Sequence, residues 1–255
     1  MVKRQKFQPI LLAMSLAALL LFARPVHAAQ AKIAIAANFA VAAKAIAVQF
    51  ERDTSHQAVL IFGSTGKLYA QIYHGAPFDV FLAADQVRPQ KTISQGLAIP
   101  GTQFTYAQGK IVLYSADPDL VDAVAKVLVR GKFSKLAIAN PKTAPYGLAA
   151  KQVLKKLGLY DRLASKIVRG ENIAQTYQFI MTGNAQLGFI AASQVVNMKS
   201  GSKSPIPEQL YAPIKQDGVL LKHGANNKAA IAFLHYLKGE KARAILTKYG
   251  YGIEE

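Results

Sequence analysis

The sequence predicts an α/β protein built from two lobes, and three observations support this prediction. Short apolar runs with strand character are repeatedly followed by runs with helical character, the alternation expected of an α/β fold. The chain has 255 residues, of which 51% are hydrophobic, enough for two modest domains with substantial cores. The composition changes near Pro100–Gly109 and again near Ser200–Pro213, which indicates a second α/β unit inserted into the first. A cleft between two such lobes is a common place for a ligand.

The first 28 residues are predicted to be a secretory signal peptide. Met1–Gln8 carries three basic residues, Ile10–Phe22 is an apolar run, and Val26–Ala28 ends in a small residue. Basic, apolar and small residues in that order are typical of a cleaved signal, and the apolar run is too short to cross a bilayer. An uncleaved membrane anchor is the alternative. We therefore expect the mature protein to be soluble and exported.

The remaining elements follow from short apolar strand-like runs and longer helical runs. A glycine ends two of the helices, because Gly158 follows the run to Leu157 and Gly183 follows the run to Met181. In chain order we predict strand 32–36, an alanine-rich helix 38–52, strand 58–62, helix 67–73, strands 79–82, 110–114 and 136–139, helix 147–157, helix 174–181, strand 187–190 and C-terminal helices over 228–249. We assign residues 29–108 plus 212–255 to lobe I and residues 109–211 to an inserted lobe II.

The chain is strongly basic, with a formal net charge of +17. The predicted signal holds four basic residues and no acids, so the mature chain keeps a charge of about +13. Such a charge suggests an anionic partner, which could be a nucleic acid, a membrane or a small anion. The lysines are scattered, however, and no basic run is interleaved with aromatic residues as in a nucleic-acid groove. We therefore expect no nucleic-acid partner.

Four predicted helices begin with residues suited to holding an anion. These helix-opening sites are Asn38, the Ser64–Thr65 pair, Pro145-Tyr146-Gly147, and Asn172. The first turn of a helix carries N–H groups without an intrahelical acceptor and a partial positive charge, and an anion placed there satisfies both. All four lie at strand-to-helix turns, the edge where α/β proteins bind ligands.

Helix capping is the competing interpretation of these residues. Asn, Ser and Thr are the favoured N-cap residues, and Asn172 followed by Gln175 resembles a capping box. For any one site capping is the favoured explanation. It is the shared placement of the four sites that favours an additional role in binding an anion.

Residues for catalysis or metal binding are not recognisable in the sequence. Gly63 to Lys67 resembles a phosphate loop, but its glycines are too close together for a Walker A motif, and no GxSxG motif occurs. The histidines lack metal-ligand spacing, and the absence of cysteine excludes disulfides and thiolate metal sites. We therefore predict a protein that is not an enzyme and needs no cofactor.

The mature chain resembles the periplasmic molybdate-binding proteins, the receptors of ATP-driven (ABC) molybdate importers. The resemblance runs from about Lys32 to Ile253 and is most specific in the pattern Gly-Ala-Pro-x-Asp-Val-Phe-x-x-Ala-Asp, Gly75 to Asp85. Further matching segments are AANFAVAAKAIAVQF, NPKTAPYG, GENIAQ, LGFIAASQ and FLHYLKGEKARAILTKYGY. The resemblance implies a type II periplasmic binding protein fold, a periplasmic location, a monomer and a permease partner.

The resemblance also implies an oxyanion site made of uncharged donors. The matching positions are the side chain and N–H of Asn38, Ala37 beside it, the hydroxyl of Thr65 with its neighbour Ser64, and the backbone N–H groups of Tyr146 and Ile173. Molybdenum would be bound solely as molybdate. Two departures concern affinity and selectivity: some relatives have serine in place of Asn38, and some have a tyrosine in place of Ala191.

Molybdate suits such a site because the deprotonated dianion accepts hydrogen bonds and donates none. Tungstate, of nearly the same size, is expected to bind as well. Hydrogen phosphate would require an acceptor, and the acid adjoining the four sites is Glu171. A receptor of the same fold for sulfate or phosphate and an extracytoplasmic enzyme acting on acidic substrates stay open as alternatives. We predict that the lobes close about a hinge near Tyr106–Lys110 and Tyr211–Gly218.

Overall fold

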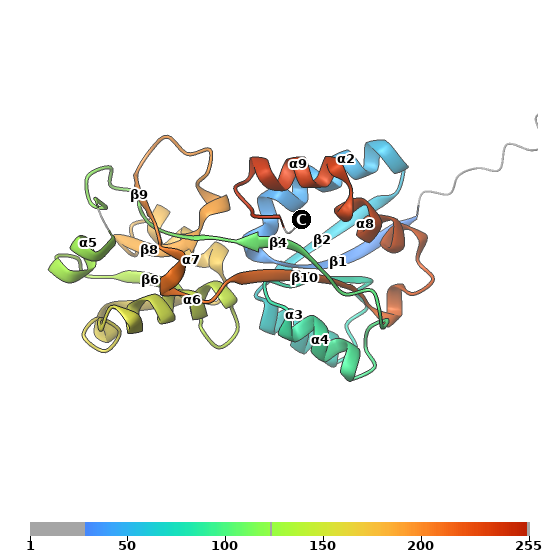
Figure 1. Ribbon diagram of the computed structural model, residues 1–255, viewed down its shortest axis with the longest axis horizontal. Helices are drawn as coiled ribbons and strands as arrows, with labels where there is room; N and C mark the ends of the chain where they lie inside the picture. The colour runs from blue at the N-terminus through green and yellow to red at the C-terminus, as the bar shows by residue number, and fades with distance from the viewer. Residues whose placement is uncertain (1–28, 123, 254–255) are drawn as a thin grey trace, which may run out of the picture.

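Residues 29–122 and 124–253 are described by the structure, a computed structural model, and they form two α/β lobes placed side by side (Figure 1). The predicted signal peptide, residues 1–28, lies outside the described residues. Within the described part of the chain, no helix is both long enough and apolar enough to cross a membrane. Each lobe has a five-stranded mixed sheet with helices packed on it, so the predicted α/β class is confirmed.

The sheet of lobe I has the strand order β2-β1-β3-β10-β4. The second strand in this order is largely apolar and buried, and its last four residues, from Ile33, are all inaccessible or nearly so. The strands are β1 (Gln30–Ala36), β2 (Gln57–Gly63), β3 (Val80–Leu82), β4 (Phe104–Gly109) and β10 (Ile214–Leu220). β1 pairs in parallel with β2 and β3, and β10 pairs antiparallel with β3 and β4.

The helices of lobe I follow its parallel strands or come from the C-terminus. They are η1 (Ala37–Phe39) and α2 (Ala40–Thr54) after β1, α3 (Thr65–Tyr73) after β2, α4 (Val87–Ser94) after β3, and η5 (Lys222–Gly224), α8 (Lys228–Lys238) and α9 (Glu240–Lys248) after β10. In Figure 1, α2, α8 and α9 lie on one side of the sheet and α3 and α4 on the other. The sheet of lobe I is thus covered on both faces.

Lobe II repeats this plan with the strand order β7-β6-β8-β5-β9. Its strands are β5 (Ile111–Ser115), β6 (Leu136–Ala139), β7 (Ile167–Gly170), β8 (Leu187–Ala191) and β9 (Ser202–Pro205). β6 pairs in parallel with β7 and β8, and β5 pairs antiparallel with β8 and β9. Its helices are α5 (Val124–Arg130), α6 (Pro145–Lys156), η2 (Ala164–Lys166), α7 (Ile173–Met181), η3 (Ala192–Gln194) and η4 (Glu208–Leu210).

The two lobes therefore place equivalent helix starts at equivalent positions. In lobe I, η1 with α2 follows strand β1, and α3 follows its parallel neighbour at the sheet edge, β2. In lobe II, α6 follows strand β6, and α7 follows its parallel neighbour at the sheet edge, β7. Because the carboxyl ends of parallel strands meet at one edge of a sheet, each lobe presents two helix starts at one edge.

The chain passes between the sheets twice. Lys110 separates β4 of lobe I from β5 of lobe II, and residues 211–213 lead from η4 back to β10. At Gly109, a β-carbon would lie 2.0 Å from the Tyr146 hydroxyl and 2.7 Å from the Gln216 side-chain nitrogen. Glycine is therefore required at the end of β4, where a side chain of lobe II reaches the first crossing.

Most predicted elements are confirmed with shifted ends, but several short elements were missed. Helix 38–52 begins as the 3₁₀ turn η1 and becomes α-helical at Ala40. The sequence did not reveal α4, β4, α5, β7, β9 or β10. β10 reads IKQDGVL, in which Gln216 and Asp217 are polar yet buried, so no apolar run marks it. The composition change at residues 100–109 coincides with strand β4 of the first sheet.

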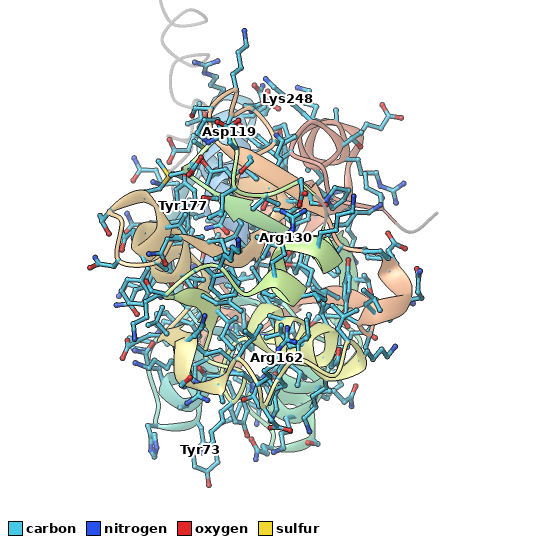
Figure 2. The ribbon with its side chains drawn as sticks, turned by 90° about the vertical axis from the view of Figure 1, so that its left-hand side faces the viewer. Tyr73, Asp119, Arg130, Arg162, Tyr177 and Lys248 are labelled. Carbon is cyan, nitrogen blue, oxygen red and sulfur yellow. The ribbon has the colours of Figure 1, made fainter. Side chains whose placement is uncertain are left out.

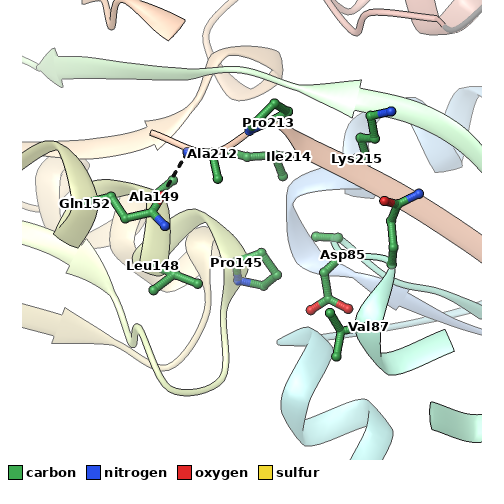
Figure 3. A pocket seen from close by; sticks show the side chains of 12 residues that line it. Asp85, Val87, Pro145, Leu148, Ala149, Gln152, Ala212, Pro213, Ile214 and Lys215 are labelled. Atoms are coloured by element: carbon green, nitrogen blue, oxygen red, sulfur yellow. Dashed lines mark hydrogen bonds between the residues drawn. The ribbon is translucent and has the colours of Figure 1, made fainter. Parts of the chain in front are cut away.

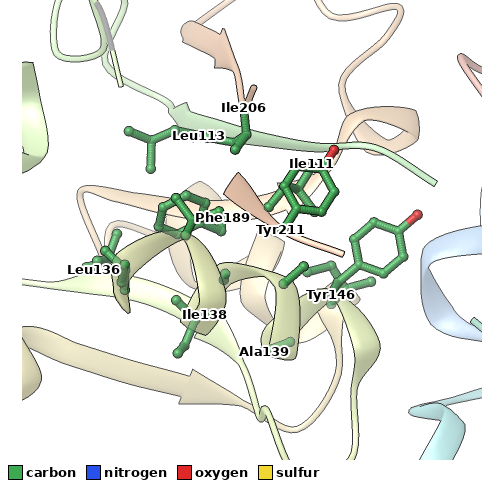
Figure 4. Close-up of a cluster of buried hydrophobic side chains, with 14 of the residues drawn as sticks. Ile111, Leu113, Leu136, Ile138, Ala139, Tyr146, Phe189, Ile206 and Tyr211 are labelled. Atoms are coloured by element: carbon green, nitrogen blue, oxygen red, sulfur yellow. The ribbon is translucent and has the colours of Figure 1, made fainter. Parts of the chain in front are cut away.

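The core of lobe II reaches the other lobe. Leu136, Ile138 and Phe189 lie within it, and Tyr146 extends from it with the hydroxyl pointing away from these residues (Figure 4). Ala36, Ala37 and Ala84 of lobe I belong to the same cluster of buried residues. The lobes are therefore packed together in this structure through small apolar side chains.

Candidate functional site

The four helix starts meet where the two lobes face each other. The Asn38 side-chain nitrogen lies 3.3 Å from the Tyr146 hydroxyl, which joins the starts of η1 and α6. The Gly66 N–H donates to the Thr143 carbonyl at 2.8 Å, which joins the start of α3 to the loop before α6. Lys67 and Glu171, beside the starts of α3 and α7, form an ion pair at 2.6 Å. Residues separated by 77 to 108 positions in the sequence are thus gathered at one junction.

The start of α7 is also linked to η1. The Gln194 side chain donates to the Ile173 carbonyl at 3.1 Å, and the adjacent Ser193 hydroxyl donates to the Asn38 carbonyl at 3.1 Å. All four predicted sites therefore belong to one ring of contacts around the interface of the lobes.

Asn38 is buried, but its side chain does not cap a helix. It lies within η1, and Phe39 is the residue before α2. Its side-chain nitrogen donates to the Gln216 side-chain oxygen at 2.8 Å and lies 3.3 Å from the hydroxyls of Tyr146 and Tyr251. The capping interpretation is therefore wrong for Asn38. The side-chain nitrogen that we expected to face an oxyanion is engaged by protein groups in this structure.

Three buried tyrosines belong to the hydrogen-bond network that contains the Asn38 side chain and Gln216. The Tyr251 hydroxyl donates to the Asn38 carbonyl at 2.8 Å, and the Tyr106 hydroxyl donates to the Gln216 side-chain oxygen at 3.1 Å. The Tyr146 hydroxyl accepts from the Gln216 side-chain nitrogen at 3.2 Å. Strands and helices from both lobes and the C-terminal segment are joined in this network.

Burial extends the pH range over which these phenols stay protonated. Removal from water raises the pKa of Tyr251 to about 12, and it raises the pKa values of Tyr106 and Tyr146 well above 10. The network is consequently uncharged at neutral pH, and its hydroxyls act as neutral donors and acceptors.

The start of α3 carries two buried hydroxyls with different surroundings. Thr65 is 1% exposed, and its hydroxyl oxygen accepts from the Ala84 N–H at 3.0 Å. Ser64 is 3% exposed and occupies the N-cap position without making a side-chain cap bond. Among the described residues, its hydroxyl has no hydrogen-bond partner. Because a buried hydroxyl without a partner is costly, the Ser64 hydroxyl is a candidate donor to a bound ligand.

Lobe II contributes backbone N–H groups at the starts of α6 and α7. Pro145 is the first residue of α6, so Tyr146 supplies the first N–H of that helix. Asn172 caps α7 by accepting from the N–H groups of Ala174 and Gln175 at 2.9 and 3.0 Å, so capping is confirmed for this residue. The cap leaves the N–H of Ile173, the first residue of α7, to other acceptors. The Gln175 side chain accepts from the Glu171 N–H rather than from Asn172, so the predicted capping box is incomplete.

The walls around these donors are apolar and uncharged. Ala37 and Ile173 are buried, and Ala191, at the end of β8, is completely inaccessible. The buried polar residues in the described chain include two acids, Asp79 and Asp217, and no lysine or arginine. The Asp217 carboxylate accepts from the side chains of Gln86, Gln103 and Thr105. An anion at this junction would thus meet amide and hydroxyl hydrogens rather than cationic side chains.

The cationic side chains are spread over the exterior. Arg130, Arg162 and Lys248 lie on separate parts of the surface in Figure 2. Exposed charges of this kind can raise the rate at which anions arrive but are screened by salt.

Several residues of the junction were not foreseen. Gln216, Tyr251 and Ser193 hold the Asn38 segment, and the Thr143 side chain contributes a second buried hydroxyl without a partner in the described chain. Gln216 lies in a strand that the sequence pattern did not show, and Tyr251 lies 213 positions from Asn38. The signal that could have found Thr143 is its place in the NPKTAPYG segment.

This chain is similar to known proteins in both sequence and structure. The family model of bacterial extracellular solute-binding proteins matches residues 31–252. The molybdate-binding protein ModA of Azotobacter vinelandii is 51% identical over 92% of this chain and 94% of its own, and that of Rhodobacter capsulatus is 49% identical over 95% and 96%. The solved periplasmic molybdate-binding protein of Azotobacter vinelandii superposes with a TM-score of 0.85 at 42% identity, covering 88% of this chain and all of that one.

Proposed function

The chain belongs to the family of bacterial extracellular solute-binding proteins, and from this premise we propose that it is a periplasmic receptor that captures molybdate for an ABC importer. The fold fits this role because two lobes with equivalent helix starts enclose a common junction. Tungstate, which resembles molybdate in size and charge, is proposed as a second ligand. A signal peptide in residues 1–28 would direct the protein to the periplasm, where it would act as a monomer.

One observation carries the proposed site: the junction combines unpartnered donors from both lobes with an absence of buried cations among the residues described. The Ser64 hydroxyl is buried without a partner, and the first N–H groups of α6 and α7 start at Tyr146 and Ile173. A dianion without protons would accept from all of these groups, and hydrogen bonds to an ionised acceptor are about twice as strong as neutral ones. We propose Asn38, Ala37, Ser64, Thr65, Tyr146 and Ile173 as the oxyanion site.

The side chain and the backbone N–H of Asn38 have different roles in the proposed site. Because its side-chain nitrogen already donates to Gln216, we propose that its backbone N–H faces the oxyanion, while the side chain holds the turn in place. Glu171, the acid that could accept a hydrogen bond from hydrogen phosphate, is paired with Lys67 at 2.6 Å. The donor set therefore favours fully deprotonated anions over hydrogen phosphate, and the size of the enclosed space would distinguish molybdate from sulfate.

A melting series tests the proposed function. The purified mature protein is heated alone and with equal concentrations of molybdate, tungstate, sulfate and phosphate. A ligand present at about 100 times its dissociation constant should stabilise the folded state by about 2.7 kcal/mol, which raises the melting temperature by several degrees. We expect this increase with molybdate and tungstate and little change with sulfate or phosphate. An equal response to sulfate would contradict the assignment and favour a general oxyanion receptor.

A further inference from the structure

Two consecutive carbonyl groups of lobe II are held by donors of lobe I. The Thr143 carbonyl accepts from the Gly66 N–H at 2.8 Å, and the Lys142 carbonyl accepts from the Arg88 guanidinium at 3.1 Å. A β-carbon on Gly66 would lie 3.0 Å from the Thr143 α-carbon, so the backbones of the lobes approach closely here. These contacts bind residues 140–144, which we call the latch loop, to the starts of α3 and α4.

Arg88 is held in place for this contact by Asp85. One carboxylate oxygen of Asp85 accepts from the Arg88 N–H at 2.9 Å, and the other pairs with the guanidinium. Both side chains are largely shielded, at 24% and 18% exposed, so the guanidinium is oriented before it reaches the other lobe. In Figure 3, Asp85 and Val87 face Pro145 and Leu148 across a groove of about 340 Å³ between the lobes.

The latch loop is itself rigid and leads directly into the proposed site. The Asn140 side chain accepts from the Lys142 N–H at 3.0 Å, and the Asn140 carbonyl accepts from the N–H groups of Thr143 and Ala144. The Asn140 N–H is anchored to the Gly170 carbonyl of β7 at 2.8 Å. Because α6 begins at Pro145, a fixed latch loop also fixes the first N–H of α6, at Tyr146.

We propose that Arg88 is a positioning residue for anion binding, which locks the latch loop against lobe I and thereby holds the Tyr146 N–H in its binding position when the lobes are closed. Arg88 lies outside the proposed oxyanion site and acts through the Lys142 carbonyl. The inference rests on the proposed function of an oxyanion receptor. Locking the closed form raises the fraction of molecules that are competent to bind, and the apparent affinity for every anion rises by the same factor.

The test compares Arg88→Ala with Arg162→Ala in the full mature chain. Arg162 is a suitable control, because its guanidinium also donates to backbone carbonyls, those of Leu128 and Val129 at 3.2 and 2.9 Å, but within lobe II. Molybdate and tungstate are titrated calorimetrically into each variant. We expect Arg88→Ala to weaken the binding of both anions by the same factor, about tenfold, because one hydrogen bond from a charged donor is lost. The affinities of Arg162→Ala should stay within about twofold of those of the wild type.

A second measurement reports the distance between the two lobes in the absence of ligand. The chain has no cysteine, so cysteines introduced at Met181 of lobe II and Ile231 of lobe I, which are 44% and 47% exposed, can carry a fluorophore pair. Arg88→Ala should shift the ligand-free distances toward longer values, whereas Arg162→Ala should not. Arg88→Gln, a smaller change, replaces the alanine variant if that one does not fold.

The outcomes separate the two proposals. A wild-type protein that binds neither anion contradicts the proposed function, and the ligand-free distances then still test the latch. If the wild-type protein binds the anions and Arg88→Ala changes neither the affinity nor the distance between the lobes, the proposed role of Arg88 is wrong. A loss of affinity that differs between molybdate and tungstate would also contradict this role, because it would place Arg88 in contact with the anion. Failure of both Arg88 variants to fold would show that the residue holds lobe I together instead.

Discussion

Lobe I and lobe II share one strand order but present different chemistry at their helix starts. In lobe I the starts carry side-chain hydroxyls and an amide, from Ser64, Thr65 and Asn38. In lobe II the corresponding starts carry an apolar and an aromatic residue, Ile173 and Tyr146, whose contribution to the proposed site is the backbone N–H. The difference teaches that a donor can be supplied by a residue of almost any type, provided that the helix start places it.

The helix starts of lobe II also differ from each other in one useful respect. α6 has proline as its first residue, which has no N–H, so its first donor comes one position later, at Tyr146. α7 begins with Ile173, which retains its N–H, while Asn172 caps the next two. The comparison therefore predicts that lobe II tolerates side-chain changes but not the loss of a backbone N–H.

The largest effect is expected for Ile173→Pro. Proline is favoured at the first helical position, and the extended backbone of Asn172 suits a residue before proline, so the helix should persist while its N–H is removed. Loss of one hydrogen bond to a dianion should weaken molybdate binding by about 100-fold in a calorimetric titration. Ile173→Ala, which keeps the N–H and loses the same packing, should bind much more tightly than the proline variant. Equal affinities of the two variants would show that this N–H does not contact the anion.

A smaller loss of molybdate affinity is expected for Ser64→Ala in lobe I, without a loss of stability of the ligand-free protein. Ser64→Ala should weaken molybdate binding by about tenfold, yet leave the ligand-free melting temperature unchanged or slightly higher, because it removes a buried hydroxyl without a partner. Thr65→Val is the informative companion, since it also leaves the Ala84 N–H without its acceptor and should lower the ligand-free stability by about 1–3 kcal/mol. Should Ser64→Ala destabilise the free protein and bind normally, Ser64 would be a structural residue.

The smallest effect concerns the tyrosines that join the lobes. Because burial raises the folded-state pKa of Tyr251 from 10.0 to about 12, its stabilising contribution is complete below pH 10 and is lost as the pH rises through 12. Melting temperatures of the wild type should therefore fall between pH 10 and 12. Tyr251→Phe should be less stable at pH 7, through lost hydrogen bonds to Asn38 and Ser193, but should decline less steeply in that alkaline range. Parallel declines in the two proteins would argue against a buried, neutral Tyr251.

The sequence predicted the helix starts better than the contacts between them. Ser64, Thr65, Tyr146 and Ile173 could be located because strand-to-helix turns have local signals: an apolar run, then a hydroxyl, proline or asparagine, then a helical run. The side-chain direction of Asn38 could not, because it depends on Gln216 and Tyr251, which are 178 and 213 positions away. The missed strand β10 shows the same limit, since its buried polar residues are stabilised by partners that tertiary contacts bring together.

The most direct test of the account is a crystal structure of the mature protein with molybdate, in which anomalous scattering locates the molybdenum. We predict a single molybdate between the lobes. Its oxygens should lie about 2.7–2.9 Å from the nitrogens of Tyr146 and Ile173 and from a hydroxyl oxygen at the start of α3. A molybdate bound elsewhere, or one contacted mainly by lysine and arginine side chains, would contradict the claim that uncharged donors of both lobes enclose the anion.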